Sequence, residues 1–120
     1  MRAKDAVGRY GERVVAQRLT RRGWKVLDRN WRCVHGELDL VCRDAAGALV
    51  FVEVKTRRST VFGDPAEAVT RQKLGRLRRL AAAWLSDHSD VRAPSIRIDV
   101  VAVLVPRSGA AEIRHVEAVG

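Results

Sequence analysis

The sequence contains little cysteine and no long apolar run. Its two cysteines, Cys33 and Cys42, are too few for a disulfide framework, and they do not form the Cys-x-x-Cys pair expected of a zinc site. No run approaches the roughly 18 apolar residues of a membrane-spanning helix. Residues 1–5 are not followed by the apolar core of a signal peptide. These absences predict a cytoplasmic protein with reduced thiols and no membrane partner.

Acidic residues are few compared with basic ones. The 23 Lys and Arg residues outnumber the 14 Asp and Glu residues, which gives a formal net charge of +9. Such a basic chain is typical of proteins that bind a polyanion, so charge favours nucleic acid over the alternative of a basic surface that is merely solvated. The sequence has no Walker loop, dinucleotide fingerprint, His-Glu-x-x-His motif or serine-nucleophile elbow. The chemistry of those motifs is therefore not expected.

The length and composition predict one α/β domain over residues 1–120. Hydrophobic residues make up 47% and charged residues 31%, which is a globular balance. We expect a helix over 4–22, strands over 24–30, 37–43 and 48–55, a helix from an N-cap at Asp64 to about Ser86, and strands over 95–105 and 111–119. Pro65 and Glu67 would complete the start of that second helix as its first residue and its capping box. The order α-β-β-β-α-β-β predicts a mixed central sheet with flanking helices.

Two neighbouring predicted strands carry charged side chains toward the interior. Because side chains alternate between the faces of a strand, Glu53 and Lys55 share a face with two large hydrophobic residues. On the preceding strand, Glu37 and Asp39 share a face. The opposite face of that strand is expected to carry Leu38, Leu40 and Cys42. A hairpin turn at 44–47 would bring Asp39 near Glu53.

Each predicted helix also places one charged residue in its apolar stripe. On a helical wheel, Glu12 falls between Ala16 and Val15, at the centre of the stripe of the first helix. Lys73 occupies the same position between Val69 and Leu77 on the second helix. Both side chains are therefore expected to face the interior.

Inward charges need partners, because burying an isolated charge costs several kcal/mol. One interpretation is a set of internal salt bridges, such as Glu53 with Lys73. The other is a metal site, since carboxylate oxygens from Asp39 and Glu53 suit Mg²⁺ or Mn²⁺. Two carboxylates on adjacent strands and Lys55 beside them could bind an ion and orient a water molecule. Glu37 could be a ligand, a supporting group or a solvated carboxylate.

The remaining candidates are weaker. Asp99 lies among apolar residues and is expected to pair with an arginine in a structural role, or to assist the site. The three histidines, His35, His88 and His115, are expected in exposed positions without metal-binding partners.

Several motifs together resemble the YraN-like family of small bacterial proteins. They are Gly11-Glu12, Asn30-x-Arg32, Gly36-Glu37-Leu38-Asp39-Leu40 and Phe51-Val52-Glu53-Val54-Lys55-Thr56-Arg57, followed by Gly63, Pro65, Lys73 and Arg97-Ile98-Asp99-Val100. The element order and the Glu-x-Lys strand are also similar to the restriction-endonuclease-like, or PD-(D/E)xK, nuclease superfamily, including archaeal Holliday-junction resolvases. The chain departs from that pattern before Asp39, where no proline stands.

The resemblance implies a nuclease site. Asp39, Glu53 and Lys55 would be catalytic. Asp39 and Glu53 would hold Mg²⁺ or Mn²⁺, with the Val54 carbonyl and Glu12 as further ligands, and Glu37 and Lys73 would support the site. The arginines that follow the site are candidates for contacts with DNA phosphates. They are Arg57, Arg58, Arg71, Arg76, Arg78 and Arg79.

The sequence therefore predicts a metal-dependent DNA endonuclease that acts on branched or damaged DNA, with a homodimer as one arrangement that could cut two strands. Two alternatives remain open at this point. One is a nucleic-acid-binding protein that keeps the nuclease-like fold without activity. The other is a basic module that binds other proteins.

Overall fold

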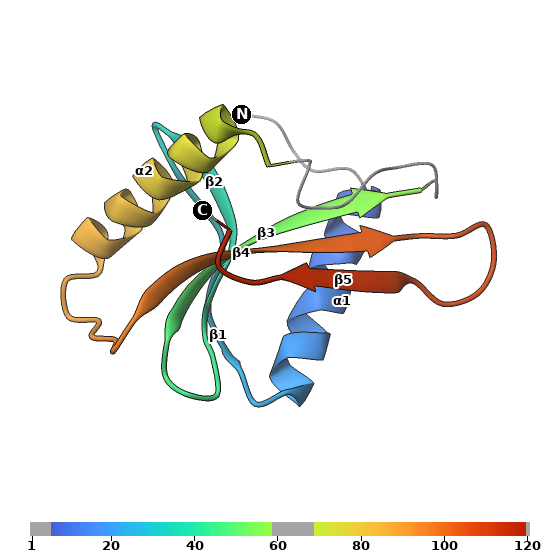
Figure 1. Cartoon of the computed structure of the whole chain (residues 1–120), viewed down its shortest axis with the longest axis horizontal. Coiled ribbons are helices and arrows are strands. Elements are labelled where there is room, and N and C mark those ends of the chain that lie inside the picture. The colour runs from blue at the N-terminus through green and yellow to red at the C-terminus, as the bar shows by residue number, and fades with distance from the viewer. Residues whose placement is uncertain (1–5, 59–68, 120) are drawn as a thin grey trace.

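The computed structural model describes residues 6–58 and 69–119, and Figure 1 shows the course of the chain. Its elements are α1 (Ala6–Arg21), β1 (Lys25–Cys33), β2 (Gly36–Arg43), β3 (Leu49–Arg57), α2 (Arg71–Asp87), β4 (Ile96–Leu104) and β5 (Glu112–Val116). This order, α-β-β-β-α-β-β, confirms the predicted α/β class. Within these described residues, neither helix is both long and apolar enough to cross a membrane.

All five strands form one mixed sheet in the order β1-β2-β3-β4-β5. β2 and β3 are antiparallel because a tight turn joins them, in which Asp44 Oδ1 accepts hydrogen bonds from the Ala46 and Ala48 main-chain N–H groups. Gly47 provides the positive φ of 93° that this turn requires. β3 and β4 are parallel, since the chain crosses over through α2 between them. The predicted mixed sheet is therefore confirmed.

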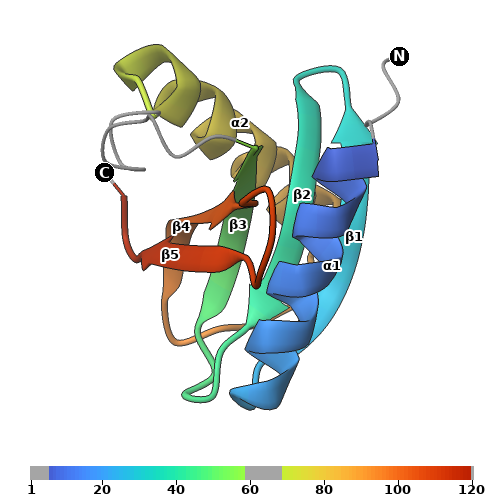
Figure 2. The same cartoon turned by 90° about the vertical axis from the view of Figure 1, so that its right-hand side faces the viewer.

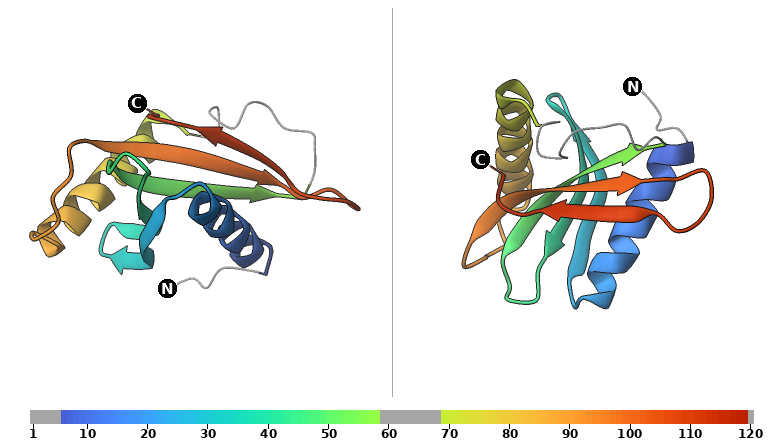
Figure 3. Two further views of the ribbon diagram at one scale, coloured as in Figure 1. Left: turned by 90° about the horizontal axis from the view of Figure 1, so that it is seen from below. Right: turned by 45° about the vertical axis from the view of Figure 1, so that its right-hand side comes forward.

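The two helices cover opposite faces of the sheet (Figures 2 and 3). On the face under α1, Val15 and Leu19 pack with residues of the central strands, including Val52. On the other face, Leu80 and Trp84 of α2 pack against Phe51. Alternate residues of β3 thus enter two separate cores, as the period of two predicts.

The alternation predicted for β2 is wrong at Leu38. Leu40 and Cys42 lie in the core under α1, as expected, whereas Leu38 lies with Val41 in the core under α2. The change of side falls at Asp39, where the paired residues of β2 and β3 end with Leu40 opposite Val52. A regular alternation does not extend across this point, because β2 is no longer held by β3.

The second helix has an N-cap of its own within the described residues. α2 begins at Arg71, and Thr70 is its N-cap, with its side-chain oxygen accepting a hydrogen bond from the Lys73 N–H at 3.1 Å. The capping box that was predicted at Asp64 and Glu67 lies outside the described residues, as does Pro65. The other predicted elements differ from the structure by up to three residues at their ends.

Candidate metal centre

Asp39 lies where β2 separates from β3. Its carboxylate is only 6% exposed, and its Oδ2 atom accepts a hydrogen bond of 2.8 Å from the Val54 main-chain N–H. The side chain thereby takes the place of a main-chain partner just beyond the last paired residues of the two strands. This position directs the Asp39 carboxylate toward β3, as the predicted hairpin requires.

Three carboxylates meet at this point. Oxygen atoms of Glu12, Glu37 and Asp39 all lie within 4.8 Å of one another, close enough to share a metal ion. Glu12 comes from α1 and is 9% exposed, which confirms its predicted inward position. Glu37 and Asp39 come from β2, and Glu37 also pairs with Arg32 through a contact of 2.8 Å to Arg32 Nε. We call these three residues the acidic cluster.

Asn30 links two members of the acidic cluster. With its amide nitrogen directed toward them, its side chain donates hydrogen bonds to Glu12 Oε1 at 2.9 Å and to Glu37 Oε1 at 3.0 Å. Its backbone has a positive φ of 52°, a conformation that asparagine tolerates better than most residues. Sequence reasoning assigned no role to this residue. The only signal was its place in the Asn30-x-Arg32 motif.

Glu12 reaches the acidic cluster because α1 approaches β3 closely at Gly11. A Cβ atom on Gly11 would overlap the Thr56 hydroxyl and would lie 3.0 Å from Thr56 Cβ. Real Cβ atoms do not make such contacts without a shift of their surroundings, so this position requires glycine. The Gly11-Glu12 motif therefore has a geometric meaning, in which the glycine permits the approach and the next residue supplies the carboxylate.

Glu53 lies on the other side of Asp39. It is 8% exposed, and burial, followed by the hydrogen bond and charge of Asp39, raises the pKa of Glu53 to about 7. Among the described residues, Glu53 is not one of the three carboxylates that gather within 4.8 Å. Asp39 is therefore the carboxylate that joins Glu53 to the acidic cluster, and the expected proximity of Asp39 and Glu53 is confirmed.

Two lysines stand beside Glu53. Lys73 Nζ lies 4.0 Å from Glu53 Oε2, at the outer limit of an ion pair, so the predicted inward position of Lys73 is confirmed. Burial, followed by the neighbouring Lys55, lowers the pKa of Lys73 to about 8. The salt bridge between Glu53 and Lys73 that the sequence allowed is thus present but long. It does not cancel the hydrogen bond and charge of Asp39, which still raise the pKa of Glu53.

The candidate phosphate-contact arginines are exposed but do not form a single surface. Arg76 and Arg79 line one cavity beside Lys73. Arg78 instead lines a second cavity, formed with the start of β4 and the C-terminal residues 118 and 119. The others are Arg57 and Arg58 at the end of β3 and Arg71 at the start of α2. Only part of the predicted set therefore lies near the acidic residues.

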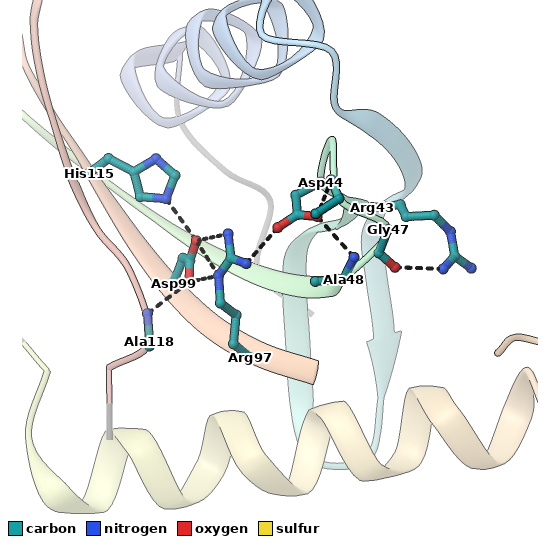
Figure 4. Close-up of polar contacts among 9 residues, drawn as sticks. Arg43, Asp44, Gly47, Ala48, Arg97, Asp99, His115 and Ala118 are labelled. Atoms are coloured by element: carbon teal, nitrogen blue, oxygen red, sulfur yellow. Dashed lines mark hydrogen bonds and ion pairs between the residues drawn. The ribbon is translucent and has the colours of Figure 1, made fainter. Parts of the chain in front are cut away.

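Asp99 belongs to a separate network on β4 (Figure 4). It is fully buried, and its oxygens accept hydrogen bonds from Arg97 Nε at 3.0 Å and from the Ala118 N–H at 2.9 Å, while His115 Nε2 lies at 2.8 Å. Arg97 also pairs with Asp44 at 2.6 Å. Burial alone would raise the pKa of Asp99, but the His115, Ala118 and Arg97 hydrogen bonds outweigh it and lower that pKa. The favoured pairing with an arginine is confirmed.

Two histidine predictions are corrected. His115 is not an exposed loop residue, because it lies on β5 with its side chain 10% exposed, in contact with Asp99. His88 caps the C-terminus of α2, where its ring stacks on Trp84 with the centroids 3.9 Å apart. His35 lies in the exposed turn between β1 and β2, as expected. Neither correction adds a histidine to the acidic cluster.

Comparison with known sequences identifies close relatives. The family described as "Uncharacterised protein family UPF0102" matches residues 11–103. A "UPF0102 protein" of Beutenbergia cavernae is 62% identical over 120 residues, covering 100% of both chains. Another, from Kineococcus radiotolerans, is 59% identical over 119 residues and covers 99% of this chain and 97% of the relative. A third, from an Arthrobacter species, is 50% identical over 120 residues and 100% of both chains.

One solved structure aligns with most of the chain. It is described as "Structure of EndoMS-dsDNA2 complex" and aligns with a TM-score of 0.45 and 18% sequence identity. The alignment covers 91% of this chain and 43% of that one.

Proposed function

This chain belongs to the uncharacterised protein family UPF0102, the family of the YraN-like proteins, and we propose that it is a divalent-metal-dependent endonuclease that hydrolyses DNA phosphodiester bonds. The observation that carries the proposal is the position of Asp39. Its carboxylate lies in the acidic cluster with Glu12 and Glu37, and it also contacts Glu53. We propose branched or damaged DNA as the substrate.

The donor set suits Mg²⁺ or Mn²⁺. Its side-chain ligands would all be carboxylate oxygens, which hard divalent cations prefer, and two of them, from Asp39 and Glu12, already lie within 4.8 Å of one another. Burial, followed by the hydrogen bond and charge of Asp39, raises the pKa of Glu53, and a bound cation would favour the charged form of that carboxyl. Such an ion would polarise the scissile phosphate and lower the pKa of a water molecule bound beside it.

The protein side chains then have distinct tasks. Asp39 and Glu53 would hold the ion, with Glu12 and the Val54 carbonyl as further ligands, while Asn30 fixes the orientation of Glu12 and Glu37. Lys55 would orient the attacking water through its compact ammonium group. Lys73, in contact with Glu53, would keep that carboxylate in position.

Positive charge would bring the substrate to this site. The net charge of +9 and the exposed arginines of α2 and the β3 end provide sequence-independent attraction for phosphates. Arg57 ends the strand that carries Glu53 and Lys55 and Arg58 follows it, so a DNA strand that reaches the acidic cluster would pass near them. We propose these residues, with Arg71, Arg76, Arg78 and Arg79, as the binding set.

A protein that binds nucleic acid without cleaving it is the second candidate. It is favoured by the contacts that partly neutralise the acids without a metal, namely Arg32 with Glu37 at 2.8 Å and Lys73 with Glu53 at 4.0 Å. The two candidates differ in their response to a divalent ion. An inactive binding protein gains no cleavage from Mn²⁺, whereas the endonuclease requires it.

The deciding experiment incubates the purified chain with linear, flapped and four-way DNA, with Mn²⁺, with Mg²⁺ and with EDTA. We expect cleavage of at least one branched substrate with either metal and none in EDTA. Glu53→Gln serves as the inactive variant and Glu112→Gln, on exposed β5, as the matched carboxylate control. Binding of all substrates without cleavage of any would favour the second candidate, and equal cleavage by Glu53→Gln would reject this site.

A further inference from the structure

A polar cavity opens on α2 beside the candidate metal centre. Its volume is about 320 Å³, and it is lined by Thr70, Gln72, Lys73, Arg76 and Arg79. Three of these residues are cations, and the other two offer a hydroxyl and an amide. Among the described residues, the lining contains no aromatic or aliphatic residue on which a nucleotide base could stack. This composition selects an anion rather than a base or an apolar ligand.

The cations of this cavity are poorly neutralised by the protein. Lys73 has one carboxylate neighbour, Glu53, at 4.0 Å. Within residues 6–58 and 69–119, no carboxylate lies within ion-pair distance of Arg76 or Arg79. Two guanidinium groups and a shared ammonium group thus converge on one cavity with a single partial counter-charge. The arrangement is favourable only for an anion that enters from outside.

Each arginine side chain passes near a glycine. The Cδ atom of Arg76 lies 4.0 Å from the Cβ position of Gly36, so its stem rests against the β1–β2 turn. Arg79 Nη1 lies 3.7 Å from the Cβ position of Gly75, so its guanidinium folds back along α2 toward the cavity. Both arginines are exposed, so an anion in the cavity can reach them from solvent.

We propose that this cavity is a phosphate subsite, which binds a nucleic-acid strand phosphate adjacent to the one held at the metal centre. The inference rests on the proposed function and adds a requirement on the substrate. Lys73 belongs to the cavity and also contacts Glu53, so the two phosphates would lie on either side of one ammonium group. The substrate must therefore carry a phosphate beyond the scissile bond on the side of α2, as an internal linkage or as a strand terminus.

The test measures the binding of a fluorescent single-stranded oligonucleotide in EDTA, where no cleavage occurs. The variant is Arg76→Gln/Arg79→Gln, and the control is Arg18→Gln/Arg22→Gln, which removes the same charge from exposed positions at the end of α1. We expect the first variant to weaken binding at least tenfold and to reduce the slope of log Kd against log salt by about 1.4. The control variant should change the affinity and the salt slope by much less. Equal losses in the two variants would overturn the subsite.

Three forms of the oligonucleotide identify the source of the phosphate. If a terminal phosphate occupies the cavity, a 5′- or 3′-phosphorylated form binds the native chain more tightly than the unphosphorylated form, and Arg76→Gln/Arg79→Gln abolishes the difference. If an internal linkage occupies it, all three forms bind the native chain equally and lose the same affinity in the variant. Unchanged affinity of the variant for every form would overturn the proposal.

The same variants separate this inference from the proposed function. Thermal unfolding with and without Mn²⁺ tests whether Arg76→Gln/Arg79→Gln is folded and still binds metal. If binding depends on Arg76 and Arg79 but no DNA is cleaved, the subsite is supported and the endonuclease is rejected. If the native chain cleaves DNA and the variant binds DNA with unchanged affinity, the endonuclease is supported and the subsite is rejected.

Discussion

The main chain of Gly11 on α1 packs directly against the hydroxyl of Thr56 on β3, with no room for a Cβ atom between them. This contact sets the distance between the helix and the sheet where Glu12 joins the acidic cluster. A change at either residue therefore reaches the site through the position of α1.

Gly11→Ala should destabilise the protein and weaken its response to metal. The added methyl group forces α1 away from Thr56, at a cost of about 1–3 kcal/mol, and moves Glu12 from Asp39 and Glu37. Thermal unfolding in EDTA and in Mn²⁺ measures both effects, and adding Thr56→Ala should recover part of the loss. The matched control is Gly75→Ala in α2, where a Cβ meets only Arg79 Nη1 at 3.7 Å. That change should stabilise the helix by about 0.5–1 kcal/mol.

Removal of any proposed catalytic residue should abolish cleavage and leave binding largely intact. The proposed catalytic residues act together on one reaction step, so each single variant should lose nearly all activity and double variants should lose little more. The single variants are Asp39→Ala, Glu53→Ala and Lys55→Ala. Affinity depends on arginines elsewhere and should change less than threefold in a filter-binding or anisotropy measurement. Full activity in Glu53→Ala would reject the proposed site.

Asp39→Asn should raise the melting temperature in EDTA. The substitution keeps the shape of the side chain and its acceptor for the Val54 N–H, and it removes one charge from a group of repelling carboxylates. We expect a gain of a few degrees, on the order of 1 kcal/mol for a domain of this size. Mn²⁺ should stabilise the native chain by mass action and the variant much less. A destabilised variant that gains as much from Mn²⁺ as the native chain would show that Asp39 is a structural residue.

The raised pKa of Glu53 predicts how stability depends on pH in EDTA. Its pKa is about 7 in the folded chain, against an ordinary value of 4.5 for a glutamate. Because the folded state holds this proton more tightly, the contribution of Glu53 to stability is fully present below pH 4.5 and is lost as the pH rises to about 7. Glu53→Gln should therefore equal the native chain in stability at pH 5 and exceed it at pH 8. A variant that is less stable than the native chain at pH 8 would contradict this prediction.

Asp99→Ala should be strongly destabilising without touching the metal response. It leaves Arg97 and the Ala118 N–H without their buried partner, a loss of about 3–5 kcal/mol by the usual cost of breaking a buried pair. The lowered pKa of Asp99 also means that its stabilising effect is present above the unfolded pKa and is lost as the pH falls through the folded one. The exposed pair of Glu112 and Arg114 is the control, because Glu112→Ala should cost less than about 1 kcal/mol.

Periodicity predicted the acidic residues of the site better than their surroundings. The helical wheel placed Glu12 inward, and the period of two placed Asp39 beside Glu53, because both patterns follow from backbone geometry within one element. The period of two gave the wrong face for Leu38, because β2 pairs with β3 only from Leu40 onward. Where the two strands separate depends on contacts between different elements, and no local pattern in the sequence of β2 predicts it.

Contacts between residues far apart in the sequence were also not predicted. His115 resembled an exposed histidine because its partner, Asp99, is on another strand and nothing in the local pattern joins them. The role of Asn30 depends on two carboxylates from different elements, and the Thr70 cap at the start of α2 was not among the predicted caps. The separation of Arg78 from Arg76 and Arg79 likewise follows from which neighbours each side of α2 meets.

The hydrogen bonds around Asp99 also bear on how the chain folds during its synthesis. β4 pairs with β3 in the centre of the sheet, yet the buried carboxylate on β4 receives its His115 and Ala118 contacts from residues that leave the ribosome later. A nascent chain that ends before residue 115 would have to bury that charge with Arg97 alone. Domains fold as units once their parts are available, so the sheet should close only after β5 has emerged. Until then the edge of β4 that pairs with β5 would stay open, and other strands could pair with it.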